Sequence, residues 1–172
     1  MPVLGAKSNL PSLFERVKMT IEIPGKSTLE LTRLLLDMNG TLSLDGKIPT
    51  GVREQLKRLA DFFSIYLLTA DTFGTARREA ADLPLEFTKV GQQGYLDKLA
   101  FLRTLGTTAT VAIGNGYNDH LMLKEAALGI AVLGPEGAHP LSLASADIVV
   151  TSIEQALDLL LHPKRIAATL RT

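Results

Sequence analysis

The chain of 172 residues is long enough for one domain with a substantial core, since 46% of its residues are hydrophobic. Lys and Arg together number 18, as do Asp and Glu, and the net charge of zero gives no electrostatic basis for binding nucleic acid or an anionic membrane surface. The chain has no cysteine, which excludes disulfides, thiolate metal sites and cysteine nucleophiles.

The first 18 residues are predicted to be an N-terminal extension carrying one short amphipathic helix at about 10–17. Residues 19–172 are expected to form a single domain. The extension has no hydrophobic signal core, and no apolar run approaches the roughly 20 residues of a membrane span. We therefore expect a cytoplasmic protein with no membrane partner.

Short runs of Val, Ile and Leu alternate with segments of helical spacing along the rest of the chain. The first two runs, 19–23 and 28–31, are joined by PGKS and predict a β-hairpin. Continuous apolar strands that alternate with helices indicate a parallel sheet covered on both faces. The further strands are predicted at 34–37, 64–70, 85–90, 110–116, 129–134 and 147–152. The helices are predicted at 51–63, 73–82, 94–106, 119–128, 139–146, 153–162 and 163–172.

Polar side chains follow several of these strands, at the edge of a parallel sheet where ligands bind. They supply a carboxylate, a hydroxyl, an ammonium group, and a further amide with a carboxylate. This set suits a phosphoryl group and a divalent cation, because a carboxylate can attack phosphorus while the other groups neutralise its oxygens. The residues are Asp37, Thr69, Asp71, Thr72, Lys98, Asn115, Asn118 and Asp119.

The segment DMNGTL, the strand end at Thr69, Lys98 and the segment GNGYND occur in this order. Together they resemble the four motifs of the haloacid dehalogenase (HAD) superfamily, in the form found in soluble relatives of the phosphorylation domain of P-type ATPases. The resemblance extends from about Ile23 to Leu161. It implies an α/β fold, a HAD-like Rossmannoid three-layer sandwich with a central parallel sheet and a small flap hairpin at 43–48. The gaps between the motifs leave no room for a cap domain.

The resemblance also implies a role for each matching residue. Asp37 matches the nucleophile, which forms an aspartyl-phosphate and binds Mg²⁺. Asn39 stands where the family has a general acid/base whose backbone carbonyl also binds the metal. Asn115 and Asp119 match the two acidic metal positions, so the implied cofactor is Mg²⁺. The implied phosphate-binding residues are Thr69, Ala70, Lys98 and Asn118, and Thr69 and Lys98 also count as catalytic.

Two positions depart from the family pattern. Asn39 cannot exchange a proton as a carboxyl group does, and the loss of a positioned acid/base typically costs about 10²- to 10⁴-fold in rate. Asn115 offers a neutral carbonyl in place of a carboxylate, so Mg²⁺ is expected to bind more weakly, held mainly by Asp37 and Asp119. We therefore predict a slow, Mg²⁺-dependent phosphohydrolase. The alternative is a degenerate member that binds phosphate or a protein partner in a regulatory role.

Other interpretations of single residues stay open at this point. Asp37 and Asp119 also suit turns and helix N-caps, and Asn115 suits a turn. Lys89 and Lys124 compete with Lys98 for the role of the cation. The run GKST lacks the preceding glycine of a phosphate-binding P-loop and is better explained as a hairpin turn.

The remaining expectations concern histidines and partners. The three histidines, His120, His139 and His162, show no shared ligand spacing and are expected at the surface or at helix caps. The expected substrate is a small phosphorylated compound or a phosphoprotein. Capless relatives often cover their open site with a neighbouring subunit, so the resemblance also implies a homo-oligomer.

Overall fold

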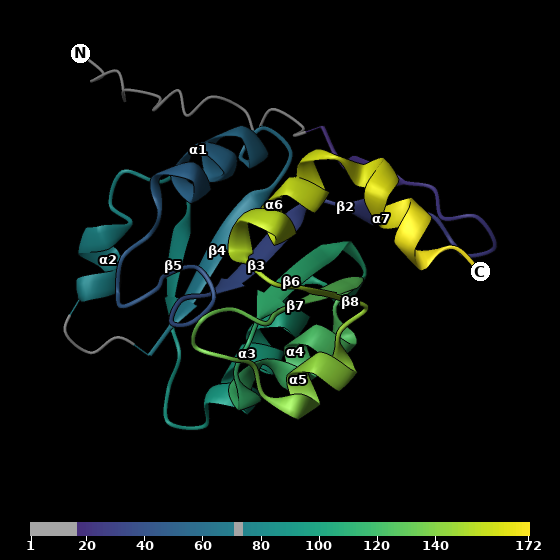
Figure 1. Cartoon of the computed structure of the whole chain (residues 1–172). Coiled ribbons are helices and arrows are strands. Elements are labelled where there is room, and N and C mark those ends of the chain that lie inside the picture. The colour runs from purple at the N-terminus through teal and green to yellow at the C-terminus, as the bar shows by residue number, and fades with distance from the viewer. Residues whose placement is uncertain (1–16, 71–73) are drawn as a thin grey trace, which may run out of the picture.

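A six-stranded parallel sheet forms the centre of the part of the chain that the computed structural model describes, residues 17–70 and 74–172 (Figure 1). The strand order is β5-β4-β3-β6-β7-β8, so the chain moves outward from β3 in one direction and then returns to build the other half. The α/β prediction is thus confirmed. The strands are β3 (Arg33–Asp37), β4 (Ser64–Thr69), β5 (Glu86–Lys89), β6 (Thr110–Gly114), β7 (Leu128–Val132) and β8 (Ile148–Val150).

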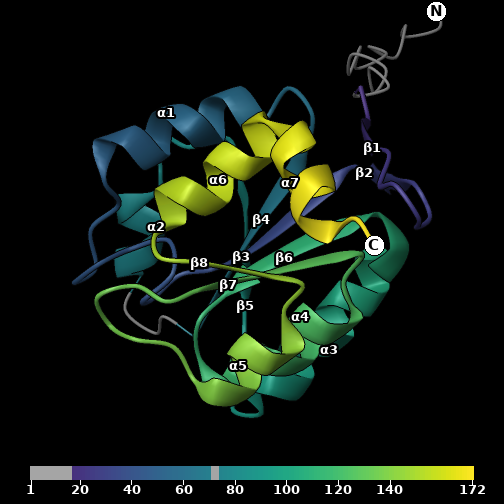
Figure 2. The same ribbon diagram turned by 45° about the vertical axis from the view of Figure 1, so that its right-hand side comes forward.

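Helices cover both faces of this sheet, which gives three layers (Figure 2). One face is covered by α1 (Thr50–Leu59), α2 (Thr75–Glu79), α6 (Ile153–Leu161) and α7 (Pro163–Leu170). The other face is covered by α3 (Gly94–Leu105), α4 (His120–Glu125) and α5 (Pro140–Ser145). Two short 3₁₀-helices, η1 (Thr107–Ala109) and η2 (Tyr117–Asp119), precede and follow β6.

Strand β3 shows why its apolar run is continuous. Leu34 and Leu36 belong to the core beneath α1 and α6, whereas Leu35 belongs to the core beneath α3 and α4. Successive side chains of a strand point to opposite faces, so a strand covered on both faces needs apolar residues at every position.

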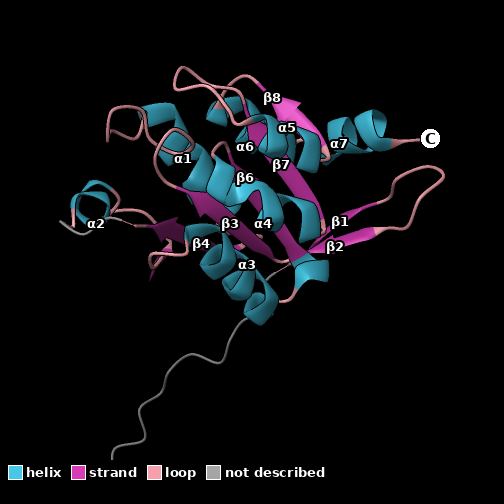
Figure 3. Ribbon diagram, turned by 90° about the horizontal axis from the view of Figure 1, so that it is seen from below, coloured by secondary structure: helices cyan, strands magenta, loops and turns pink. Residues whose placement is uncertain are grey.

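The predicted hairpin at the start of the domain is confirmed as β1 (Met19–Ile21) and β2 (Leu29–Leu31), which pair antiparallel (Figure 3). It packs against the C-terminal end of the chain, where the backbone N–H of Thr172 donates to the carbonyl of Pro24 at 3.3 Å. This contact lies at the edge of the sheet where β3 begins, opposite to the edge where the polar strand ends gather.

The predicted small flap hairpin is confirmed as a tight antiparallel turn between Leu44 and Lys47. Leu44 and Lys47 exchange both backbone hydrogen bonds at 3.0 Å, around the Asp45-Gly46 dipeptide that two-residue hairpin turns favour. In the described residues, the segment between β3 and β4 holds this flap and α1, and the segment between β4 and β5 holds α2. Neither holds a cap domain, as predicted.

The predicted elements differ from the structure mainly in length. The helix expected at 51–63 ends at Leu59, where the N–H groups of Asp61 and Phe62 bond to the carbonyls three residues earlier and tighten the last turn, and Phe63 then enters the core. In the described residues, no helix has the length and apolar character needed to cross a membrane. The helix predicted at 10–17 falls, except for its last residue, outside the described residues, as do Asp71 and Thr72.

Gly129 in β7 provides a test of the packing between β7 and α4. A Cβ atom at this position would stand 2.2 Å from the Leu123 carbonyl oxygen, which is backbone and has no side-chain freedom to move away. We expect Gly129→Ala to lower the free energy of unfolding by about 1–3 kcal/mol, the usual cost of overpacking. Urea unfolding followed by circular dichroism measures this.

Gly51 is the matched control, because a Cβ there meets nothing within 4 Å. Gly51→Ala lies in α1 and should leave stability unchanged or raise it by up to about 1 kcal/mol. Equal effects of the two substitutions would contradict this account of the packing.

Candidate active site

Asp37 is the last residue of β3, and the alternation of side chains between the two faces of that strand sets the direction of its carboxylate. Leu35, two residues earlier, packs beneath α3 and α4, so Asp37 points toward the same layer of helices. Its carboxylate is buried, with 9% of the residue exposed. A carboxylate in such a place needs a partner, and α3 supplies one.

Lys98 is that partner. It lies on the buried side of α3 with Leu99 and Leu102, and only 2% of it is exposed. Its ammonium nitrogen Nζ donates to Asp37 Oδ1 at 2.5 Å and to Asp119 Oδ1 at 2.6 Å. Of the three lysines that the sequence offered, the structure brings Lys98 to Asp37, whereas Lys89 and Lys124 are both exposed.

Asp119 lies behind Lys98 and is fully buried. Its second oxygen, Oδ2, accepts from the backbone N–H groups of Asn115 and Gly116 at 2.9 and 2.8 Å. Both oxygens of Asp119 are therefore engaged by the protein. This geometry positions Lys98 and the turn after β6, whereas the sequence led us to expect Asp119 chiefly at a metal ion.

Two carboxylates share one ammonium group in this cluster, and the balance of charges shifts the pKa values. Burial, and next the charge of Asp119, raise the pKa of Asp37 to about 6 although Lys98 opposes them. Burial lowers the pKa of Lys98, but Asp37 and Asp119 outweigh it and the net direction is upward. Lys98 thus stays charged, and the ionised cluster holds one negative charge in excess.

A cavity of about 220 Å³ opens at this end of the sheet. All of the predicted site residues that the structure describes, except Asp119, line it. They come from the ends of β3, β4 and β6, from α3 and from η2, so the fold brings together segments that are far apart in the sequence. The predicted lining residues are Asp37, Asn39, Thr69, Ala70, Lys98, Asn115 and Asn118.

Thr41 is a site residue that sequence reasoning did not single out. Its hydroxyl lies 3.2 Å from Asp37 Oδ2 and 3.0 Å from Asn115 Oδ1, and its single proton can be donated to one of them at a time. Its place four residues after Asp37, at the end of the DMNGT run, was the available signal.

Asn115 is satisfied at both ends of its amide. Oδ1 accepts from Thr41, and Nδ2 donates to the Gly137 carbonyl at 3.2 Å. An aspartate here would set a carboxylate oxygen against that carbonyl oxygen, which also can only accept. Asparagine therefore fits the hydrogen bonds of this turn better than the aspartate that the family pattern has.

Mg²⁺ prefers oxygen ligands and is usually held by one or two carboxylates together with substrate phosphates and waters. The cavity is lined by Asp37, which has a carboxylate, and by Asn39 and Asn115, which have amide oxygens. The excess negative charge of the cluster of Asp37, Lys98 and Asp119 favours a cation. Among the described residues, no three Asp, Glu or His side chains gather into a metal-binding group. The residues therefore fit a metal ion that depends partly on the substrate for its ligands.

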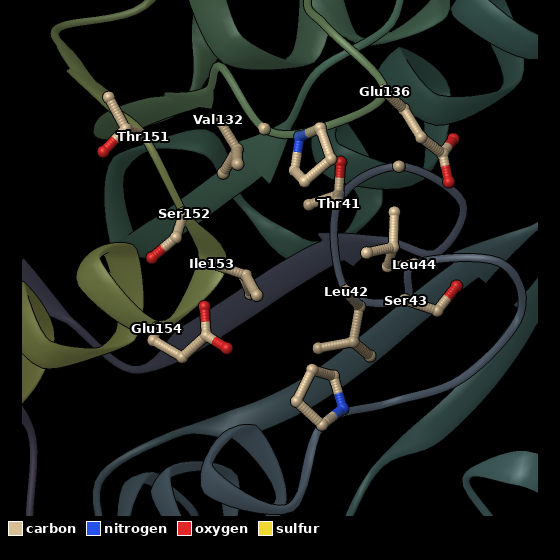
Figure 4. A pocket seen from close by; sticks show the side chains of 14 residues that line it. Thr41, Leu42, Ser43, Leu44, Val132, Glu136, Thr151, Ser152, Ile153 and Glu154 are labelled. Carbon is tan, nitrogen blue, oxygen red and sulfur yellow. The ribbon is translucent and has the colours of Figure 1, made fainter.

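A second cavity of about 190 Å³ is lined on one side by the segment 40–44 (Figure 4). Its apolar lining includes Leu42, Val132 and Ile153. Glu136 stands at its edge, and a Cβ on Gly40 would lie 2.8 Å from Glu136 Oε2 and 2.6 Å from Asn115 Nδ2. Gly40, which has a φ of +73°, thus lets a carboxylate that the sequence did not indicate come close to the Asn115 turn.

Two proteins of Methanocaldococcus jannaschii, both named only as uncharacterized, are similar to this chain in sequence. MJ0073 is 57% identical over 61 residues, which are 36% of this chain and 66% of MJ0073, slightly less than two thirds of that relative. MJ0072 is 54% identical over 39 residues, which are 23% of this chain and 89% of MJ0072. No protein-family model matches the chain.

Solved structures resemble the fold over most of the chain. A Legionella pneumophila protein assigned to HAD subfamily III A gives a TM-score of 0.65 at 20% identity, covering 81% of this chain and 87% of its own. The 3-deoxy-D-manno-octulosonate 8-phosphate phosphatase of Moraxella catarrhalis, solved with magnesium and phosphate, gives a TM-score of 0.62 at 18% identity. That match covers 82% of this chain and 94% of the phosphatase. The cobalt-bound YrbI phosphatase of Haemophilus influenzae gives a TM-score of 0.65 at 17% identity, and the match covers 83% of this chain and 94% of that protein. At these identities the similarity shows the fold, which is that of HAD hydrolases.

The raised pKa of Asp37 predicts a pH dependence of stability in metal-free buffer. Between its ordinary value of 3.8 and about 6, the folded protein holds a proton that the unfolded chain has released. The stabilising contribution of Asp37 is therefore fully present below about pH 4 and is lost as the pH rises through about 6.

We expect the free energy of unfolding of the wild type, relative to Asp37→Asn, to fall by roughly 2–3 kcal/mol across this window, at about 1.4 kcal/mol per pKa unit. Urea unfolding in EDTA at several pH values measures the difference. A difference that does not change with pH would show that Asp37 ionises normally.

Proposed function

We propose that this chain, which belongs to the same family as MJ0072 and has the haloacid dehalogenase fold, is a slow Mg²⁺-dependent phosphohydrolase that acts through Asp37. One observation carries the proposal. The Asp37 carboxylate stands at the carboxyl end of the central strand, bonded to a buried lysine, in the wall of a cavity that Thr69, Asn115 and Asn118 also line.

Asp37 would act as the nucleophile. One of its oxygens attacks the phosphorus of a phosphomonoester, the bond from phosphorus to the leaving oxygen breaks, and an acyl phosphate forms on Asp37. A water molecule then attacks that phosphorus, which releases inorganic phosphate and restores the carboxylate. When bound, Mg²⁺ would neutralise charge on the phosphoryl oxygens.

The other residues of the cavity would hold the phosphoryl group. Lys98 places an ammonium charge next to Asp37, and two hydrogen bonds fix its position. Thr69 and Asn118 offer a hydroxyl and an amide at the wall of the cavity. Fixed charges and dipoles in a buried site stabilise the spread charge of phosphoryl transfer without having to reorganise.

Asn39 is the reason to expect slow turnover. It lines the cavity, but at neutral pH its amide can neither donate a proton to a leaving oxygen nor accept one from water. Both protons would then have to be exchanged with solvent. We propose that the phosphorylated form of Asp37 is therefore longer-lived than in an enzyme with a carboxyl group at this position.

The alternative function is a phosphate-binding or regulatory protein without turnover. The hydrogen bonds of Asn115 favour it, since they satisfy within the protein a neutral amide that stands where the family pattern has a metal-binding carboxylate. The range of possible substrates is a separate point. Because the described residues hold no cap, either a small phosphorylated compound or a phosphoprotein could reach Asp37.

Removing the Asp37 carboxylate tests the main proposal. We expect Asp37→Asn to lower Mg²⁺-dependent hydrolysis of p-nitrophenyl phosphate by roughly 10³-fold or more, because the nucleophile is lost while the shape of the side chain is kept. Asp61→Asn is the matched control, since Asp61 is an exposed residue before β4, at the opposite edge of the sheet. Equal activity of wild type and Asp37→Asn would refute the proposal.

Restoring the two acids separates the two functions. We expect the double variant Asn39→Asp with Asn115→Asp to hydrolyse the same substrate about 10²-fold faster than the wild type, or more, because it regains a general acid/base. The single variants show how much each position contributes. A Mg²⁺-dependent acyl phosphate on Asp37 of the wild type, detected by mass spectrometry, would support slow natural turnover.

A wild-type rate indistinguishable from that of Asp37→Asn, followed by a large gain in the double variant, would instead support the regulatory function. Little change in the double variant would show that the natural asparagines suffice for the reaction.

A further inference from the structure

Four aromatic side chains gather beside the phosphate cavity. Tyr117 is the centre of the group: its ring centroid lies 5.8 Å from that of Tyr95, 4.9 Å from that of His120 and 5.1 Å from that of His139. Tyr95 and His120 also stack on each other, with centroids 6.1 Å apart. We call these four residues the aromatic surface. The sequence scatters them over more than 40 positions, but α3, η2, α4 and the loop before α5 bring them together.

The aromatic surface is carried by the same segments of the chain as the cavity wall, although its four rings are not among the residues that line the cavity. Tyr95 follows Gly94, and Tyr117 stands between Gly116 and Asn118, and all three of these neighbours line the cavity that holds Asp37. The loop before α5 is tied to the same place, since the backbone N–H of His139 donates to the Asn115 carbonyl at 2.8 Å. The rings are therefore held next to residues of the cavity wall, outside the cavity itself.

Hydrogen bonds hold the two imidazoles in place. His120 Nδ1 lies 2.6 Å from the Tyr117 carbonyl, which can only accept, so this nitrogen carries a proton. His139 Nδ1 accepts from the backbone N–H of Leu141 at 3.2 Å, so this nitrogen carries none. Fixed rings lose little freedom when a ligand binds, which is the property that makes aromatic side chains effective binding surfaces.

Exposure distinguishes this surface from ordinary core packing. Tyr117 is 49% exposed even though it touches the three other rings, and the other three are half-buried. A tyrosine that served only to fill the core would be covered. Figure 2 shows that α3, α4 and α5, which carry or flank these residues, lie together on one face of the sheet.

We propose that the aromatic surface binds the leaving group of the substrate, and that this group carries a flat aromatic ring. The inference rests on the proposed function, because the cavity is taken to hold the phosphate. Ring pairs in offset or edge-to-face contact attract each other beyond their apolar burial, so an aromatic ligand should be preferred to a saturated ring of equal size.

Binding of two phosphonates, which cannot be hydrolysed, tests the inference. Benzylphosphonate and cyclohexylmethylphosphonate share the charged group and the size of the ring, and only the first is aromatic. In isothermal titration calorimetry with Mg²⁺, we expect the wild type to bind benzylphosphonate about three- to tenfold more tightly.

Tyr117→Leu should bind the two phosphonates within about twofold of each other, while Tyr117→Phe should keep the preference. Leu133→Ala is the control, because Leu133 is an exposed apolar residue outside the aromatic surface, and it should also keep the preference. Tyr95→Leu provides a second variant with the same expected loss, should Tyr117→Leu fail to give a cooperative urea unfolding transition.

The outcomes separate this inference from the proposed function. Equal affinity for both phosphonates in the wild type, or a preference that persists in Tyr117→Leu, would overturn the aromatic surface and leave the phosphate site standing. Failure of both phosphonates and of inorganic phosphate to bind would overturn the phosphate site and the aromatic surface together.

Discussion

The buried contact of Lys98 with Asp37 and Asp119 is the constraint on which the rest of the site depends. Removing three charged groups from water is costly, and the cost is offset only when the charges are close and their remaining hydrogen-bonding capacity is met. Lys98 donates hydrogen bonds of at most 2.6 Å to both carboxylates, and two backbone N–H groups donate to the second oxygen of Asp119. The contact fixes α3 against the ends of β3 and β6, so the same interaction that holds these elements in place also shapes the cavity.

The asparagines at positions 39 and 115 differ in what holds them. Asn115 is built into the turn by its bonds to Thr41 and Gly137, so its amide has a structural role whatever its part in catalysis. Asn39, by contrast, is exposed. Under the proposed function, a site that has a nucleophile but weak proton transfer would hold a phosphoryl group for longer than a fast phosphatase does.

The two sides of the site differ in chemistry. Toward α1 and α6, the segment 40–44 faces a second cavity with an apolar floor and Glu136 at its edge (Figure 4). Toward α3, the cavity that holds Asp37 is lined by Gly94, Lys98, Gly116 and Asn118, and Tyr117 stands between the last two in the chain. Under the proposed function, selection of a substrate has to come from such walls, because in the described residues no inserted domain covers Asp37.

The sequence by itself determined the parts that depend on local pattern. Apolar runs of strand length predicted the parallel sheet, and the carboxyl ends of those runs marked Asp37 and Thr69, because strand ends in such a sheet lie at one edge. Helical spacing placed Lys98 on α3, but the choice between Lys98, Lys89 and Lys124 required the burial that only packing provides. The tertiary structure alone decided that Asp119 bonds to Lys98 and two amides, that Thr41 joins Asp37 to Asn115, and that scattered histidines meet two tyrosines. These contacts join residues on separate elements, and their distances follow from how the helices pack on the sheet, which no local pattern encodes.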